Sequence, residues 1–437
     1  MATTMLAGAA EVVITPPVGT PLAGYFTPRI SEGVIWDLKA KAVVAGDGAE
    51  AVGIIACDLI AIYPEIIVKA REKFEAATGI PGNRILVCAT HTHTGPETRG
   101  NRLVPTNPEY IETLPDLIAQ AGIEAANNRR PCVLSVGRDQ EEGLAFNRRF
   151  RLRDGSEQFG PGTPEETAGV AGPTDPEMGV LKFAEEGQDP FALIVNYSLH
   201  IDVTSGNLIS ADYPAMISET VRATYGPDTI VLFVQGACGN INHVPYQQER
   251  VWPIPRSGVA KSTQIGRALG GKAICIAEKA LPSVDQTVDM ESEILDVPAY
   301  PRDEVLEKRL EIARAENPPN FFNETLLKWV EDYDETARRP VETQVVRLGD
   351  AVFCSAPGEL FVEWGLEMKK WSPHPFTFIA ELANECVGYI PTFEAFRRGG
   401  YEATPVVSVK LTPALGQMVT DANFRSCQEL WRRRGGA

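Results

Sequence analysis

The sequence ILVCATHTHTGP (residues 85–96) joins a short apolar run to two histidines. The run follows a turn-like segment at residues 79–83, and this pattern favours a buried strand over a helix. His91 and His93 come directly after the run, and the glycine-proline pair at residues 95–96 then ends regular structure. Ligands and catalytic groups commonly lie at strand ends, so we expect a site where this strand ends.

The spacing of the two histidines sets a condition on the backbone. Side chains alternate along an extended segment, so His91 and His93 can line one pocket only if the chain bends, and Gly95-Pro96 favours a bend there. Taken alone, such a pair more often represents solvated or hydrogen-bonded histidines. The chain has only five histidines, however, and four of them lie close to an apolar run with a turn nearby. Because histidine is the commonest metal ligand and titrates near neutral pH, this placement indicates functional use.

Length and composition limit the class of protein. The 437 residues suffice for one large domain or two to three ordinary ones, and 44% hydrophobic with 23% charged residues is typical of a soluble globular protein. The formal net charge of −17 argues against nucleic acid or an anionic membrane surface as a partner. No apolar run approaches the length of a membrane span, and the first residues lack the pattern of a secretory signal. We therefore expect a cytoplasmic protein without a membrane span.

The eight cysteines are scattered without CxxC spacing, and several lie in apolar segments. This distribution favours buried free thiols over disulfides or a cysteine zinc site.

Segments with strand patterns alternate with segments of helical periodicity. This order predicts an α/β protein in which a mixed β-sheet core is flanked by helices in layers. The expected strands are residues 9–15, 36–46, 51–58, 85–90, 132–138, 178–184, 191–197, 229–234, 342–355 and 376–381, and the expected helices are 64–78, 108–128, 214–224, 258–280, 360–370 and 412–434. We find no internal repeat and no clean linker, so a single domain over residues 1–437, or two interleaved lobes, is expected.

Two segments depart from this alternation. Residues 149–175 are rich in glycine, proline and charge, which predicts an irregular loop, one that could cover the site. Residues 302–340, within an excursion at about 299–340, are charged and helix-prone. They are compatible with a lid and equally with a solvated helical hairpin on the surface.

Four potential metal ligands each follow a predicted strand. They are His91, His93, His200 and Glu359. Catalytic zinc usually takes three protein ligands of these types and keeps one position open for water. The sequence has neither HExxH nor CxxC, so residue spacing alone supports a metal site and its absence about equally. Glu359 could instead be a carboxylate favoured by the dipole at a helix N-terminus.

The two remaining histidines carry weaker signals. His374 lies between two prolines and is expected in an exposed loop. His243 follows a glycine-bearing turn and could be either a pocket residue or a satisfied polar group.

Five sequence boxes together resemble the neutral/alkaline non-lysosomal ceramidase family. They occur in the same order as in that family and span nearly the whole chain. The boxes are GAAEVVITPPVGTPLAGY (8–25), ATHTHTGP (89–96), QGACGNIN (235–242), SAPGELF (355–361) and GYIPTFEAFRRGGYE (388–402). The resemblance implies a zinc amidohydrolase related to enzymes that cleave the amide of N-acylsphingosine.

The resemblance also implies roles for individual residues. Family members hold zinc through two histidines, a glutamate and a tyrosine, which correspond here to His91, His200, Glu359 and Tyr389. The tyrosine that helps to hold the scissile carbonyl, the asparagine-arginine pair and the pocket histidine beside the metal correspond to Tyr401, Asn147-Arg148 and His93.

Such a site has a clear chemistry. Two neutral imidazoles and one carboxylate leave zinc a single positive charge, which lowers the pKa of bound water towards neutrality. The hydroxide would attack an acyl carbon that zinc and a donor such as Tyr401 or Arg148 polarise, and His93 could carry the proton to the leaving group. Asp58 and Asp212 are candidates for orienting an imidazole N–H, although a cap or turn role is equally compatible with each.

The sequence departs from the family in three respects. Asn242 stands where the ceramidases have a serine, so no hydroxyl at this position can act as a nucleophile. The signal peptide and the additional C-terminal β-domain of the secreted ceramidases are not expected here either.

We therefore expect a Zn²⁺-dependent hydrolase of a small-molecule amide that is smaller or more polar than ceramide. An esterase or lactonase with the same zinc site is the first alternative, and a catalytically inactive, ligand-binding relative is the second. The five intact positions His91, His200, Glu359, Tyr389 and Tyr401 disfavour the inactive relative. The sequence does not predict the oligomeric state.

Overall fold

A nine-stranded mixed β-sheet forms the centre of the computed structural model, which describes residues 5–99, 104–246 and 255–435. The strand order is β16-β14-β13-β8-β1-β5-β6-β7, with β18 paired to β8; β6–β7 and β14–β16 are parallel and the other pairs antiparallel. These strands are β1 (Met5–Val13), β5 (Lys39–Ala45), β6 (Val52–Cys57), β7 (Ile85–Ala89), β8 (Arg130–Gln140), β13 (Glu177–Ala184), β14 (Pro190–Tyr197), β16 (Ile230–Gln235) and β18 (Leu281–Pro282).

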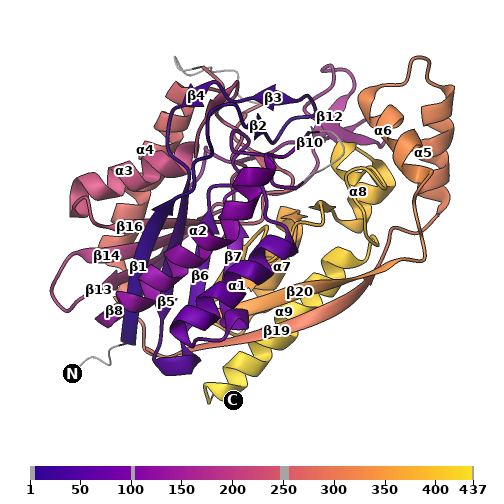
Figure 1. The fold of residues 1–437 in the computed structure, drawn as a ribbon. Coiled ribbons are helices and arrows are strands. Elements are labelled where there is room, and N and C mark those ends of the chain that lie inside the picture. Colours follow the sequence, from indigo (N-terminus) through magenta and orange to yellow (C-terminus); the bar gives the residue numbers. More distant parts are fainter. Residues whose placement is uncertain (1–4, 100–103, 247–254, 436–437) are drawn as a thin grey trace.

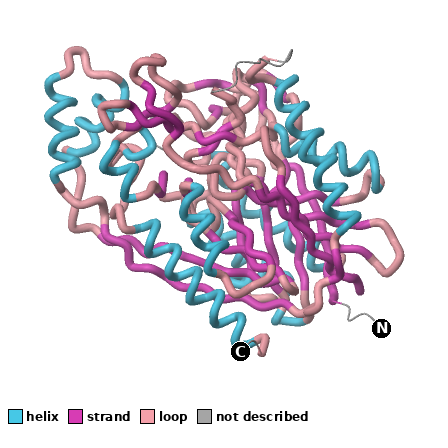
Figure 2. The backbone as a smooth tube through the Cα atoms, turned by 180° about the vertical axis from the view of Figure 1, so that it is seen from behind, coloured by secondary structure: helices cyan, strands magenta, loops and turns pink. Residues whose placement is uncertain are grey.

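A four-stranded sheet packs against one face of the large sheet, and helices cover the two outer faces (Figures 1 and 2). This smaller sheet has the order β19 (Val288–Pro298), β20 (Arg338–Leu348), β21 (Ala351–Ser355), β23 (Phe376–Ala380). The large sheet is covered by α1 (Pro64–Thr78), α2 (Pro108–Asn127), α3 (Tyr213–Tyr225) and α4 (Val259–Lys279), and the smaller one by α7 (Val362–Trp371) and α9 (Leu415–Arg433). The layered α/β prediction is thus confirmed, in a four-layer form.

Strand β7 shows why the sequence around residue 85 is apolar without interruption. Ile85, Val87 and Ala89 enter the core beneath α1 and α2. Leu86 and Cys88 enter the core between the two sheets. A strand buried on both faces has no position for a polar residue, and truncating one of its large side chains typically costs about 2–5 kcal/mol of stability. This double burial holds the residues after β7 in a fixed place.

The helix at 64–78 has the predicted bounds because both ends carry clear signals. Pro64 occupies its first turn, and Gly79 ends it with a φ of 71°, in the left-handed region that glycine adopts freely. The other predicted helices and strands are also found, with ends shifted by a few residues, except that residues 342–355 contain the end of β20 and the whole of β21, joined by a turn.

Two parts of the fold differ from the sequence prediction. Residues 149–175 are not irregular throughout, because they contain a small sheet of β10 (Arg149–Leu152), β11 (Glu157–Phe159) and β12 (Thr167–Val170). Strand β19 was not predicted; it pairs with β20 along its whole length, and its acidic residues occupy partly or fully exposed positions. Sheet pairing overrides the polar local pattern in both cases. Strand β19 pairs with the distant β20, whereas β10 pairs with β11 and β12, which lie close by in the sequence.

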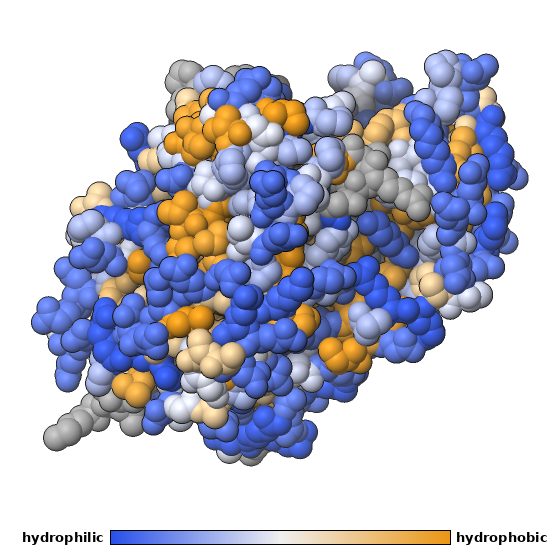
Figure 3. Space-filling view, in the orientation of Figure 1, coloured by the Kyte–Doolittle hydropathy of each residue, from blue (hydrophilic) through white to orange (hydrophobic). Residues whose placement is uncertain are grey.

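The charged excursion forms a helical hairpin of α5 (Glu304–Ala315) and α6 (Phe321–Val330), at the upper right of Figure 1. Its visible outer surface is largely hydrophilic in Figure 3. The other side is aromatic, because Phe321 and Phe322 lie 5.0 and 4.9 Å, between ring centroids, from Phe26. The hairpin therefore packs on the body of the protein and is not solvated all round.

Short elements complete the description. They are β2 (Pro21–Leu22), β3 (Arg29–Ile30), β4 (Gly33–Val34), β9 (Phe146–Asn147), β15 (Leu208–Ile209), β17 (Ile241–Asn242), β22 (Glu359–Leu360), β24 (Tyr389–Ile390), α8 (Phe393–Arg398) and 3₁₀ turns at Gly48–Glu50, Gly82–Arg84 and Tyr401–Ala403. All eight cysteines are free thiols, and only Cys275 is exposed. Within the described ranges, no helix has both the length and the apolar character that crossing a bilayer requires.

Candidate metal centre

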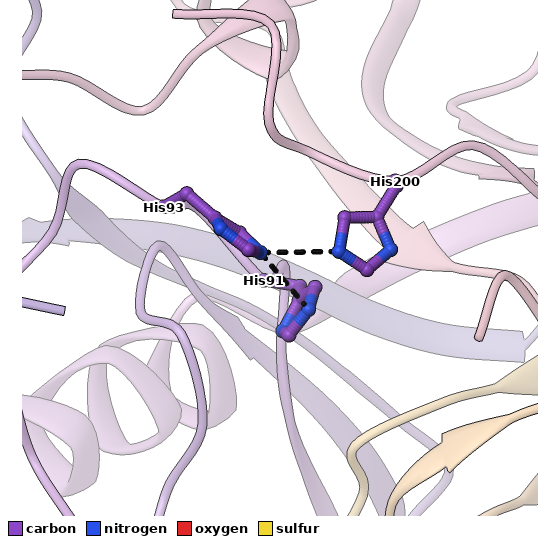
Figure 4. A group of neighbouring side chains, drawn as sticks. All are labelled: His91, His93 and His200. Carbon is purple, nitrogen blue, oxygen red and sulfur yellow. Dashed lines mark hydrogen bonds between the residues drawn. The ribbon is translucent and has the colours of Figure 1, made fainter. Parts of the chain in front are cut away.

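Three histidine side chains meet beyond the ends of β7 and β14 (Figure 4). The Nε2 atom of His93 lies 3.3 Å from Nε2 of His91 and 3.1 Å from Nε2 of His200. His91 and His200 are buried, whereas the His93 side chain remains 12% exposed. The three ring nitrogens are close enough together to hold one metal ion.

The bend that brings His91 and His93 to one side lies at His91 and not at Gly95-Pro96. His91 has a φ of 81°, a left-handed conformation that is rare for residues other than glycine and costs about 1–3 kcal/mol. Its backbone N–H donates to the carbonyl of Leu59 at 2.9 Å, which helps to hold this conformation. Strain at this position is therefore what allows an H-x-H pair to line one pocket.

The hydrogen bonds of the imidazoles determine where their lone pairs point. Nδ1 of His91 lies 2.8 Å from the carbonyl oxygen of Ile60, and Nδ1 of His200 lies 3.4 Å from that of Cys238. A carbonyl oxygen only accepts hydrogen bonds, so each Nδ1 carries the proton and each Nε2 presents a lone pair. Two lone pairs thus face the centre of the cluster, as metal-binding histidines require.

Glu359 adds a carboxylate to the same point. Its Oε2 atom lies 3.4 Å from Nε2 of His91 and accepts no well-formed hydrogen bond from the part of the chain that the structure describes. A carboxylate oxygen and an imidazole lone pair repel each other unless a proton or a cation lies between them. Imidazoles and a carboxylate are a donor set that suits zinc, so these residues fit a divalent metal ion.

Two tyrosines and an arginine lie beside Glu359. The parallel pair β22–β24 sets Glu359 opposite Tyr389. The Arg148 guanidinium donates to the Tyr389 hydroxyl at 3.1 Å, and the two hydroxyls of Tyr389 and Tyr401 lie 3.4 Å apart. Arg148 is fixed by two further hydrogen bonds, to the carbonyl of Gly239 and to the carboxylate of Glu402.

The ionisation of the site favours metal binding. Burial lowers the pKa of His93 and of His200 well below that of a free histidine, so both are neutral at pH 7. Burial acts to raise the pKa of Glu359, but the neighbouring His91 imidazole, Tyr389 hydroxyl and Arg148 guanidinium outweigh it and lower this pKa to about 2. The site therefore presents the neutral imidazoles of His93 and His200 and an anionic carboxylate near neutral pH.

A cavity of about 140 Å³ opens onto the cluster. Besides His91, His93, Glu359, Tyr389 and Tyr401, its wall includes Tyr25, Phe26, Arg99, Phe321, Trp329 and Lys410. A larger cavity, of about 490 Å³, lies elsewhere and is lined by no histidine. Because the reactive groups line the smaller cavity, we take it as the candidate site.

Comparisons with known proteins show which solved structures share the fold of this chain. No protein-family model and no curated protein matches the sequence. The structure superposes on a neutral ceramidase from Pseudomonas aeruginosa with a TM-score of 0.75 and 17% identity, over 99% of this chain and 75% of that one. A ceramidase complexed with C2 gives a TM-score of 0.75 and 17% identity, over 98% of this chain and 76% of that one.

The chain has the fold of the neutral ceramidases. This confirms the resemblance drawn from the five sequence boxes, as a distant one. The ceramidase-like fold also brings together six of the residues that the resemblance singled out, namely His91, His93, His200, Glu359, Tyr389 and Tyr401, with Arg148 in contact with Tyr389.

Other residues named from the sequence lie outside this cluster. The Asn147 amide donates to the carbonyl of Pro173. Asn242 makes hydrogen bonds to the Tyr246 hydroxyl and to the N–H of Val244, so it stabilises its own turn. His243 is buried but is not among the residues that line the cavity.

The two aspartates have local structural roles. Asp58 accepts from the N–H of Lys39 and from the Thr90 hydroxyl. Asp212 accepts from backbone N–H groups at residues 203, 204 and 213 and thereby caps α3. The carbonyls of Ile60 and Cys238 hold the imidazole N–H groups instead.

The prediction that His374 is exposed is wrong. Its ring is buried, with Nε2 at 3.0 Å from the carbonyl oxygen of Cys427 and its ring edge-on to Trp431. Helix α9 covers the proline-flanked loop, a contact that the local sequence cannot reveal.

Sequence reasoning missed several residues around the cluster. Asp202 lies 3.8 Å from Nδ1 of His93 and accepts a hydrogen bond from the Tyr25 hydroxyl at 2.7 Å. The H-x-D spacing from His200 to Asp202 was a usable signal for the aspartate. Lys410 and the aromatic residues of α6 carry no local signal, since only the fold brings them to the cavity.

Proposed function

We propose that this protein is a zinc-dependent amidohydrolase whose substrate is smaller or more polar than ceramide. His91, His200, Glu359 and Tyr389 would hold the metal. The observation that carries the proposal is the meeting of two unprotonated imidazole nitrogens with a carboxylate oxygen that lacks a well-formed hydrogen bond. We assign the activity to a single catalytic domain over residues 1–437 and expect it in the cytoplasm.

Each residue of the site would have a defined task. A bound zinc ion would act as a Lewis acid, polarising the carbonyl and lowering the pKa of water. Tyr401 and Arg148 donate hydrogen bonds towards the carbonyl oxygen as negative charge develops on it. Neutral His93 accepts a proton from water and returns it to the leaving nitrogen. The net reaction is R–CO–NH–R′ + H₂O → R–COOH + H₂N–R′.

Asp202 would position His93 for this proton transfer. At 3.8 Å it is too far for a hydrogen bond to Nδ1 of His93, but its charge favours the imidazolium that forms during turnover. The Tyr25 hydroxyl fixes the carboxylate from the other side.

The cavity supports a substrate of modest size. Its volume of about 140 Å³ lies below the roughly 300–1,000 Å³ of most small-molecule pockets. Phe26 and Phe321 pack against each other and both line the cavity, which restricts the space for a long acyl chain.

Metal analysis with a substrate panel tests this function. We expect the purified protein to contain about one zinc per chain, to hydrolyse short acyl amides, to lose activity on chelation and to regain it with zinc. Turnover that survives chelation would contradict the zinc mechanism. Preference for esters or lactones in the same panel would replace the amidase assignment, and a zinc-loaded protein inert towards every substrate would support the ligand-binding relative.

A further inference from the structure

One cation in the wall of the candidate site has no carboxylate partner among the residues that the structure describes. Lys410 is exposed and lines the same cavity as His91 and Glu359. Among the described residues, no carboxylate oxygen lies within 4.0 Å of its Nζ atom. The ring centroid of Trp329 lies 6.0 Å from Nζ. An unpaired lysine is ordinary on an open surface, but this one lines the cavity that opens onto the histidine cluster.

The neighbouring cations are already neutralised. The Arg99 guanidinium binds both oxygens of Glu97 at 3.0 Å, and Arg339 pairs with Glu385. Both arginines lie near enough to act on the charge of Lys410. Among the described neighbours, three cations and two carboxylates leave one positive charge over, and Lys410 is the cation without a carboxylate partner.

The same cavity has an apolar aromatic wall. Phe321 and Trp329 come from α6, and Phe26 packs on Phe321 from the loop between β2 and β3. A molecule that reaches the histidine cluster therefore meets both an aromatic surface and a single ammonium group.

We infer that the substrate is an amide that carries a carboxylate, of the N-acyl amino acid type, and that Lys410 binds this carboxylate while an apolar group packs on Phe26, Phe321 and Trp329. One available positive charge matches a monoanion, whereas a phosphate carries about two charges and is usually held by more donors. The assignment of the scissile amide rests on the proposed function, but binding of the carboxylate does not.

Binding of a matched pair of probes tests the inference. The probes are 3-phenylpropionate and the neutral 3-phenylpropionamide, titrated calorimetrically into the full chain both zinc-loaded and chelated. We expect the carboxylate to bind at least about tenfold more tightly than the amide in both forms. In Lys410→Met the carboxylate should bind no better than the amide, with amide affinity and zinc content unchanged.

Lys308→Met is the matched control, because Lys308 is an exposed lysine of α5 and does not line the cavity. It should bind both probes as the unaltered protein does. A carboxylate preference that appears only with zinc would mean that the metal holds the anion, and a preference retained in Lys410→Met would exclude the lysine; either result overturns the inference. If the protein bound no zinc but still preferred the carboxylate to the amide, the result would contradict the proposed function and leave this inference standing.

Discussion

At His91, backbone conformation and chemistry depend on each other. Its left-handed φ turns the ring towards His93 and His200, and the Ile60 carbonyl then fixes which nitrogen carries the proton. Strained residues of this kind persist where the surrounding structure holds them, and they cluster at functional sites. Double burial of β7 supplies that support here, because the preceding five residues cannot shift without disturbing two cores.

Replacing single histidines distinguishes ligand from proton carrier. We expect His200→Ala to lose the bound zinc, because it removes one of the two inward-facing lone pairs. His93→Ala should keep most of the zinc and hydrolyse substrate about 10²–10⁴-fold more slowly, the usual contribution of general acid–base catalysis. Elemental analysis of each purified variant, together with its kcat, checks both statements. Equal zinc loss would make His93 a ligand, an assignment that its 3.1 Å and 3.3 Å contacts make worth testing.

At the residue scale, the sequence could predict those site residues whose signal lies in their own stretch of the chain. Strand ends drew attention to His91, His200 and Glu359, and the five boxes added Tyr389 and Tyr401. The roles of Asp58 and Asp212 were left open because a cap and a histidine partner look alike in sequence. Lys410 was missed because its importance depends on which distant side chains surround it.

At the element scale, the predictions succeeded where a segment carries its own signals. Helix α1 begins with a proline and ends at a left-handed glycine, so its bounds could be predicted. The strands β10–β12 carry scattered charge and pair with one another over short sequence separations. Strand β19 has alternating charge, and only pairing with the distant β20 makes it a strand. The α5–α6 hairpin was left undecided for the same reason, since its aromatic side finds its partner at Phe26.

Packing of the His374 loop on α9 should make stability depend on pH. Burial lowers the pKa of His374 from 6.5 to about 4 in the folded protein. Between these values the unfolded chain binds more protons at this residue. The contribution of His374 to the free energy of unfolding is therefore fully present above pH 6.5 and is lost as the pH drops towards 4. We expect His374→Gln to lose part of this dependence. Urea unfolding of chelated protein at pH 7.0, 5.5 and 4.5 measures how the free energy of unfolding changes with pH. The same change in the variant and in the unaltered protein would contradict this role of His374.

At the scale of the whole molecule, the candidate site joins the two sheets. His91 and His200 follow strands of the large sheet, whereas Glu359 follows β21 of the smaller one. Composition predicted a soluble, acidic protein, and the alternation of strand and helix patterns predicted a layered one. No local pattern could show that these three strand ends meet. That meeting depends on the packing of one sheet against the other, through side chains such as Phe353 and Phe378 of the core between them.

Because the metal would link segments far apart in sequence, zinc should stabilise the entire fold. A ligand that binds only the folded state adds about 4 kcal/mol when its free concentration is a thousandfold above Kd. We expect zinc to raise the Tm of the chelated protein by several degrees, a shift that grows with zinc concentration. His200→Ala should lose this response and Lys308→Met should retain it, as differential scanning calorimetry would show. A Tm that zinc leaves unchanged would mean that His91, His200 and Glu359 do not bind the metal together, whatever the fold resembles.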